Sequence, residues 1–453
     1  MTILTCKKLS CFLLLSFSFS LFSTGLNAQL KLSGQLRTRS EFRDGQGAPL
    51  PKDSSAAFFT SQRTRLSLEY SAYRLRFGLT VQDVRVWGQD GSTINRSTTA
   101  DNNGLMIHEA WAEIMFTDTS NKKQQVSLKV GRQELVYDDQ RLIGNLDWLQ
   151  QARRHDAAVF RFNSAAWLVD GGFAFNQNKE KASGTSYNST ISGNYTGNTN
   201  GGTNYKSFEY LYAKRKLNEG SLSYLFFADQ FNKYQLTEIN NVAVKQFRTG
   251  SWSRFTTGFY LNNRFNKLLL TASAYYQGGE TAAGQQLSAA LLSANLLYDF
   301  TKKLNGGPGM DYTSGGSSGN TSHAFDPLYG TPHKFWGSMD YFYAGSGFGN
   351  RGLFDYYIKA NYQPSPELKI ALDLHQFMSA SAVSDGGSHL LSRNFGTEAE
   401  VVCSYSLTRQ IGFEAGYSHF FGTAALSSPQ VKNIPDARKN SNWAYAGINI
   451  HIF

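Results

Sequence analysis

Arginine is the residue type whose spacing in this sequence indicates a binding chemistry. The chain of 453 residues contains 22 arginines, and 14 of them fall between residues 29 and 161. A planar guanidinium group donates paired hydrogen bonds to carboxylate and phosphate groups, and a ring of arginines inside a pore selects for anions. The candidate site residues are Arg37, Arg39, Arg63, Arg65, Arg74, Arg76, Arg85, Arg132, Arg153 and Arg154.

An alternative interpretation of these arginines is structural. Glu41, Glu69, Asp83, Glu109 and Glu113 lie in the same third of the sequence. They can neutralise the arginines in a ladder of ion pairs that stiffens a wall. The two interpretations are compatible if a minority of the arginines lack an acidic partner, and the formal net charge of +10 favours such a surplus.

Motifs for catalysis or metal binding do not stand out. The eight histidines form no HExxH motif and show no paired metal spacing, and the three cysteines form no cluster. For the acidic pair Asp138 and Asp139, a solvated loop is favoured over a cation site. We therefore expect a protein that is not an enzyme, with no cofactor, no metal site and no nucleic-acid partner.

Alternation of polar and apolar residues identifies the elements that position the arginines. In residues 30–43, LKLSGQLRTRSEFR, the odd positions are polar or charged, and the even positions are mostly apolar or small. Residues 61–70 repeat this pattern. Because alternate side chains separate onto two faces only in a strand, these segments are predicted to be β-strands with one charged face and one apolar face.

Two environments accommodate such strands. A soluble β-sandwich turns the apolar face inward, whereas an outer-membrane barrel turns it to lipid and turns the charged face to a lumen. Many of the alternating runs reach the roughly 9–11 residues that a tilted membrane strand needs. Short turns also alternate with long polar loops. The predicted fold is therefore an all-β, transmembrane antiparallel β-barrel with short periplasmic turns and long extracellular loops, large enough to enclose water.

Eighteen strands are predicted, an even number that returns both termini to one side of the membrane. The segment 304–314 is kept in spite of its glycines and Pro308, because it preserves the order of short and long connections. The predicted strands are 30–43, 58–70, 73–87, 107–116, 124–135, 153–162, 166–176, 205–217, 220–232, 247–263, 267–279, 287–300, 304–314, 352–363, 366–379, 394–408, 410–421 and 442–453. The predicted long loops are 44–57, 88–106, 136–152, 177–204, 315–351, 379–393 and 422–441.

The first 28 residues have the features of an export signal. Lys7 and Lys8 precede the apolar run 11–22, and Ala28 stands at the expected cleavage point. No later run of apolar residues is long enough for a helical membrane span. The predicted organisation is a secretory signal peptide at 1–28 and one barrel at 29–453, located in the outer membrane of a Gram-negative bacterium.

Residues 128–162, LKVGRQELVYDDQRLIGNLDWLQQARRHDAAVFRF, resemble a known family. The GRQ start, the RLIGNLDW loop and the RRHDA return are similar to the corresponding strand, loop and strand of the alginate-export family of outer-membrane β-barrels. Other similar segments are 36–43, 62–66, 81–88, 326–342 and 350–360. The resemblance therefore covers nearly all of 29–453.

This resemblance implies an eighteen-stranded barrel with an anion-selective lumen, lined by arginine and lysine, that passes a polyuronate. Arg132, Arg153 and Arg154 flank one loop, so a structural role at the loop base is equally favoured for them. The positions that match the charged part of the family are Arg37, Arg39, Arg63, Arg65, Arg85, Arg132, Arg153 and Arg154.

Three functions remain open at this point. The first is a channel for acidic oligosaccharides or polysaccharides, such as alginate, in export or passage. The second is an anion-preferring general diffusion porin, and the third is an adhesion or structural barrel that binds a partner through its long loops. The expected partners are outer-membrane lipid and an anionic saccharide or another small anion. Any periplasmic export partner is unidentified, and a monomeric barrel is expected.

Overall fold

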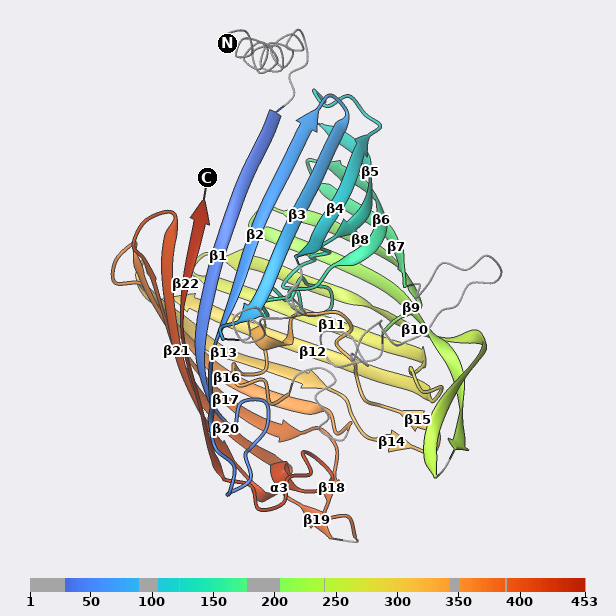
Figure 1. The fold of residues 1–453 in the computed structure, drawn as a ribbon, viewed down its shortest axis with the longest axis vertical. Coiled ribbons are helices and arrows are strands. Elements are labelled where there is room, and N and C mark those ends of the chain that lie inside the picture. Colours follow the sequence, from blue (N-terminus) through green and yellow to red (C-terminus); the bar gives the residue numbers. More distant parts are fainter. Residues whose placement is uncertain are drawn as a thin grey trace, which may run out of the picture.

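The barrel is closed by pairing between its first and last strands. The computed structural model describes residues 29–88, 105–121, 123–176, 204–239, 241–342, 350–387 and 389–452. Within them, 18 antiparallel strands form one continuous sheet, which closes where β1 pairs with β22. β1 begins and β22 ends at the same end of the barrel (Figure 1), as an even number of strands requires. No helix in the described part of the chain is long and apolar enough to cross a membrane.

Each predicted strand has a counterpart in the structure, and the segment 304–314 is confirmed as a strand. The barrel strands are β1 (Gln29–Asp44), β2 (Ala57–Ala72), β3 (Leu75–Val86), β4 (Met106–Met115), β5 (Gln124–Gln133), β6 (His155–Ser164), β7 (Trp167–Phe175), β8 (Ser207–Leu217), β9 (Gly220–Ile239), β10 (Val242–Phe265), β11 (Leu268–Glu280), β12 (Gln286–Asp299), β13 (Leu304–Thr313), β16 (Leu353–Tyr362), β17 (Leu368–Ser379), β20 (Asn394–Ser406), β21 (Ile411–Gly422) and β22 (Asn440–Ile452). The connections contain β14 (Ser317–Ser318), β15 (Thr321–Ser322), β18 (Val383–Ser384), β19 (Leu390–Leu391), the 3-10 helix η1 (Pro332–Lys334) and the short helix α3 (Ala424–Ser427). The predicted signal peptide and most of the predicted loops 88–106 and 177–204 lie outside the described residues.

Pro308 fits within β13 because the pairing beside it is interrupted. β13 pairs with β12 at Gly309, opposite Asn295, and next at Gly306, opposite Tyr298. Proline has no backbone N–H, so a strand tolerates it where the hydrogen-bond ladder is broken. The glycine-rich sequence of this segment is therefore compatible with a strand in the barrel wall.

The predicted strand boundaries are wrong in two regions. The predicted strands 58–70 and 73–87 leave a turn at Ser71–Ala72, but the turn lies at Tyr73 and Arg74, where Arg74 has a φ of 59°. The apolar positions change here from even numbers, as at Tyr70 and Ala72, to odd numbers, as at Leu75, but Ala72 and Tyr73 are adjacent apolar residues, so the pattern does not locate the turn to the residue. β9 and β10 pair as far as Ile239 and Val242, beyond the predicted ends, and project from the barrel (Figure 1). Both faces of this arm of β10 are exposed, so no apolar face marks the strand.

The two faces of the barrel wall are reversed relative to a soluble sheet. On β2, Leu66 is 49% exposed, whereas the side chain of Arg63 is 1% exposed. Elsewhere, Phe160 and Leu292 repeat the exposed apolar side chains, and Asp170 repeats the buried charge. An apolar outer face and a polar inner face are the arrangement of a membrane barrel, and they exclude a soluble sandwich.

Two connections fold back into the barrel and pair there. We call residues 134–152, between β5 and β6, the first inward loop, and residues 323–342, between β15 and β16, the second inward loop. Ile143 and Tyr329 form a parallel β-bridge, and the N–H of Gly144 donates to the carbonyl of Tyr329 at 3.0 Å. Leu146 and Met339 are fully buried, and Met339 belongs to the apolar cluster of the interior. The expectation of a wholly water-filled lumen is therefore corrected, because the inward loops pack against part of the wall.

Candidate functional site

Four of the predicted arginines form one patch on the lumen wall. Arg37 and Arg39 lie on β1, Arg63 and Arg65 lie on β2, and Arg37 is directly opposite Arg63 in the antiparallel register. The alternation of side chains puts the odd-numbered residues of both strands on the same face. We call these four residues the arginine patch. Positive charges this close together need a negative partner if they are to stay buried.

The partner of the arginine patch comes from the first inward loop. Asp147 Oδ2 lies 3.1 Å from Nη1 of Arg37, and Oδ1 lies 2.8 Å from Nη1 of Arg63 and 3.3 Å from Nη1 of Arg65. One carboxylate therefore contacts three guanidinium groups. The side chain of Asp147 is 42% exposed, compared with 1% for Arg63. The carboxylate is the accessible part of an otherwise buried ion cluster.

The arginine patch keeps Asp147 ionised. Burial acts to raise the pKa of the Asp147 carboxyl group. The hydrogen bond from Arg63 and the positive charges of Arg63, Arg37 and Arg65 outweigh burial and hold that pKa below its ordinary value. The three arginines are thus arranged around one ionised carboxylate.

Trp148 fixes the fourth arginine of the patch. Nη1 of Arg39 donates to the backbone carbonyl of Trp148 at 2.8 Å, and its guanidinium carbon lies 4.0 Å from the centre of the Trp148 ring. The ring stacks on His333 of the second inward loop at 4.2 Å and 10°. His333 is in turn bound to Asp340 at 2.8 Å. Both inward loops are therefore attached to the arginine patch through one aromatic ring.

Arginines outnumber carboxylates among the ion pairs of the patch. Glu41 pairs with Arg39 and with Arg43, each at 2.9 Å, and Glu134 lies 3.9 Å from Arg65. Together with Asp147, the ion pairs of this cluster in the described residues hold three carboxylates and five guanidinium groups, an excess of two positive charges. The charge of Glu109 also acts on Arg65 from outside these pairs. The arginines are Arg37, Arg39, Arg43, Arg63 and Arg65, and the acids are Glu41, Glu134 and Asp147.

An open space adjoins this cluster. A cavity of about 580 Å³ lies between the wall and the inward loops, and Arg37, Arg39, Asp147 and Trp148 line it. The other side of the cavity is formed by residues of β20, β21 and β22, among them Glu414. The space is therefore bordered by the accessible carboxylate of Asp147 and by the side chains of Arg37 and Arg39.

The comparisons with known proteins agree with this geometry. The family model described as alginate export matches residues 28–437. The chain belongs to the alginate export family. The earlier resemblance is thereby confirmed, and this alginate export family member is an outer-membrane β-barrel channel. No curated protein sequence matches the chain.

Solved porin structures share the fold of this alginate export family member. OpdO of Pseudomonas aeruginosa has a TM-score of 0.59 and 12% identity, covering 94% of this chain and 97% of its own. OccAB4 of Acinetobacter baumannii has a TM-score of 0.59 and 12% identity, over 94% and 98% of the two chains. The BenF-like porin of Pseudomonas fluorescens Pf-5 has a TM-score of 0.58 and 11% identity, over 94% and 98%. Identities this low show a common fold and nothing finer.

Arg153 has a structural position in this alginate export barrel. Its Nη1 donates to the carbonyls of Gly144 at 3.1 Å and Gly330 at 2.6 Å, and it also contacts the carbonyl of Tyr329. Arg153 therefore links the first inward loop to the second. This is a structural role, one of the two roles considered for the arginines at the base of this loop. Arg154 next to it lies 3.7 Å from the sulfur of Met106.

Four other predicted arginines lie away from the patch. Arg76 is on the lumen face of β3, 3.6 Å from Glu113, and Arg74 is in the turn before that strand. Arg85 is opposite Gln62, and Arg132 is opposite Ala110 and Asp156. In these registers Arg85 and Arg132 lie on the outer face of the wall, paired with Asp83 and Asp156 at 2.7 Å and 2.8 Å. A lumen position for these two is therefore corrected, because their strand parity is opposite to that of the patch.

Other charged pairs of the lumen were not predicted. Arg161 binds Asp170 at 2.7 Å, Arg254 binds Asp229 at 2.6 Å, and Arg141 binds Asp311 at 2.8 Å. Arg161 and Arg254 lie within predicted strands, so the alternation of polar and apolar residues around them could have indicated that they face the lumen. Asp147 had no such signal, because loop residues have no period that indicates a face.

Proposed function

We propose that this outer-membrane channel passes anionic solutes and that acidic oligosaccharides or polysaccharides, such as alginate, are its substrate class. The observation that carries this proposal is the single accessible carboxylate of Asp147, shared by three guanidinium groups. A uronate chain carries one carboxylate on each sugar. Each of these carboxylates has the same charge and the same pair of oxygen atoms as the Asp147 carboxylate that the arginine patch binds.

Asp147 also limits how tightly a solute is held. Conduction requires a site that attracts a solute and then releases it to the next position. When a solute carboxylate approaches Arg37 or Arg65, it competes with Asp147 for the same N–H groups. The surplus of two positive charges supports attraction, and the internal carboxylate supports release.

Block of ion current by a uronate oligomer tests this proposal. With the purified protein in a planar bilayer, we expect a reversible, saturable block by the oligomer and none by a neutral oligosaccharide of equal length. Arg65→Gln should weaken the block by about tenfold, because a charged hydrogen bond is lost. Arg132→Gln, which changes an arginine of the outer face, is the matched control and should leave it unchanged.

The same experiment separates the proposal from a general porin. An anion-preferring porin without polymer specificity would conduct small anions and show no saturable block by the oligomer. A block that is equal for charged and neutral oligosaccharides would overturn the proposed role of the arginine patch.

A further inference from the structure

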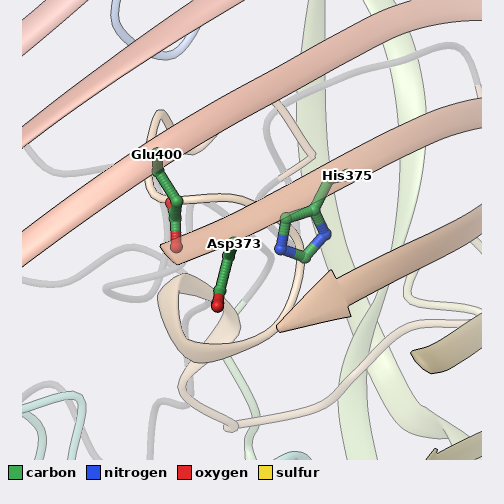
Figure 2. A group of neighbouring side chains, drawn as sticks. All are labelled: Asp373, His375 and Glu400. Carbon is green, nitrogen blue, oxygen red and sulfur yellow. The ribbon is translucent and has the colours of Figure 1, made fainter. Parts of the chain in front are cut away.

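A second group of ionisable side chains lies on the lumen face of β16, β17 and β20. In the register of these strands, Lys359 is opposite Asp373, which is opposite Glu400, and His375 is opposite Glu398. Figure 2 shows Asp373, His375 and Glu400 extending from neighbouring strands into one region. One ligand atom from each of these three lies within 4.8 Å of the others. The three side chains are therefore close enough to share one small cation.

His375 has one ring nitrogen in use and one without a partner. Its Nδ1 lies 2.9 Å from the carboxylate of Asp355. Its Nε2 is buried and, among the described residues, has no hydrogen-bond partner. The side chain as a whole is only 1% exposed. A buried nitrogen without a partner is costly, and a bound cation would satisfy it.

The contact with Asp355 sets the state in which His375 can bind a metal. When Nδ1–H donates to a carboxylate, the proton is fixed on Nδ1 and the lone pair of Nε2 is available. Carboxylate, histidine and metal in this order are the usual arrangement around a metal-binding imidazole, in which the carboxylate orients the ring. The Nε2 atom without a partner and the contact of Nδ1 with Asp355 therefore both favour a metal cation bound at Nε2.

The local charge also favours a cation. Asp355, Asp373, Glu398 and Glu400 face the same region, and Lys359 neutralises Asp373 from one side. Four carboxyl groups with one lysine leave an excess of negative charge. Oε2 of Glu398 is a further buried atom that lacks a hydrogen-bond partner within the described chain.

We propose that His375, Asp373 and Glu400 form a binding site for a divalent transition-metal cation in the lumen wall. One imidazole nitrogen and two carboxylate oxygens suit Zn²⁺ and its first-row neighbours, whereas Mg²⁺ and Ca²⁺ prefer oxygen ligands alone. This site lies on different strands from the arginine patch, and the metal site does not rest on the proposed anion passage.

The site is connected to the second inward loop. The backbone N–H of Ser338 donates to Glu400 Oε2 at 3.1 Å, and that of Met339 donates to Glu398 Oε1 at 2.9 Å. A cation bound to Glu400 would fix the carboxylate that holds this loop. Metal binding is therefore expected to reduce the motion of the second inward loop.

Titration of the untagged, full-length barrel in detergent with ZnCl₂ tests the proposal. Isothermal calorimetry should show one saturable site, which His375→Gln and Glu400→Gln abolish. Asp355→Asn should weaken binding by about 10–100-fold, because it removes the group that orients the ring. His419→Gln is the matched control, since His419 is opposite Asn442 on a different pair of strands.

X-ray absorption of the zinc-loaded wild-type barrel adds a measurement that requires no variant. The proposal predicts nitrogen and oxygen ligands, with the outer-shell scattering of a single imidazole. Absence of saturable binding to the wild type, unchanged binding in His375→Gln, or zinc ligation without an imidazole would overturn it.

Discussion

Arg63 on β2 lies 2.8 Å from Asp147, which is 84 positions further along the chain. The guanidinium group is buried in the wall, and the carboxylate is on a loop that has folded back into the lumen. This contact makes the wall and the first inward loop one unit. The position of the loop, and hence the width of the passage beside it, depends on a charge that a solute can imitate.

Asp147→Asn should increase the anion preference of the channel. The substitution removes the negative charge that three arginines share, while the amide keeps one oxygen acceptor. The reversal potential under a KCl gradient should move further toward that of chloride. The loss of the charged partner of Arg63 should lower the free energy of unfolding by about 1–3 kcal/mol.

Asp156→Asn is the control for this substitution, because it removes an acidic partner of an arginine on the outer face. Its reversal potential should equal that of the wild type. If Asp147→Asn leaves the reversal potential unchanged, Asp147 does not face the conducting path.

Acidification should reproduce the effect of Asp147→Asn. The pKa of Asp147 is held below its ordinary value of about 3.9. The stabilisation from its charge is therefore complete above that ordinary value and is lost as the pH falls through the lower, folded-state pKa. Once the pH has fallen through this lowered pKa, protonation releases the three arginines, and the anion preference should rise.

Reversal potentials measured from neutral to acidic pH test this expectation. The difference between the wild type and Asp147→Asn should be largest at neutral pH and should disappear at the acidic end. A difference that persists undiminished in acid would show that another group controls the selectivity.

Trp148→Ala should widen the passage beside the arginine patch. The ring of Trp148 lies between Arg39 and His333, so its removal opens a contact between the two inward loops. Loss of the cation–π contact should lower the free energy of unfolding by about 0.5–2 kcal/mol. Single-channel conductance should rise in this variant. In Trp87→Ala, which changes an exposed tryptophan after β3, the conductance should stay at the wild-type level.

The fold was predictable because alternation is a local signal that the barrel preserves along each strand. Even the glycine-rich β13 could be predicted, from the order of short and long connections. The tight turn at Tyr73 and Arg74 and the exposed arm of β9 and β10 were not predictable in the same way. In the turn the alternation changes phase across two adjacent apolar residues, Ala72 and Tyr73, which leaves the turn position open, and in the arm neither face is buried.

Only the residues of the site that lie on the barrel strands could be predicted from the sequence. Alternation shows that Arg37 and Arg63 share a face, but a pattern in one strand does not reveal which loop folds against it. Asp147 and Trp148 reach the patch through contacts between residues more than 80 positions apart. Arg85 shows a different limit of sequence-based prediction. A shift of one position along a strand decides whether an arginine faces the lumen or the outside.

Leu66→Arg should destabilise the barrel if the wall is oriented in lipid as its faces indicate. Leu66 is an exposed apolar residue of the outer face, near the middle of β2. An arginine near the bilayer midplane costs about 2–4 kcal/mol. Unfolding by urea in lipid vesicles measures this loss. Ser67→Arg, at the adjacent lumen-facing position, should cost much less, and equal losses in the two variants would contradict the assigned faces.

The reversal potential of the purified wild-type protein in a planar bilayer, under a KCl gradient at neutral pH, tests the central claim most directly. The excess of arginine over carboxylate in the ion-paired cluster of the lumen wall predicts a potential of the sign set by chloride. A potential of the sign set by potassium would contradict the proposed anion passage.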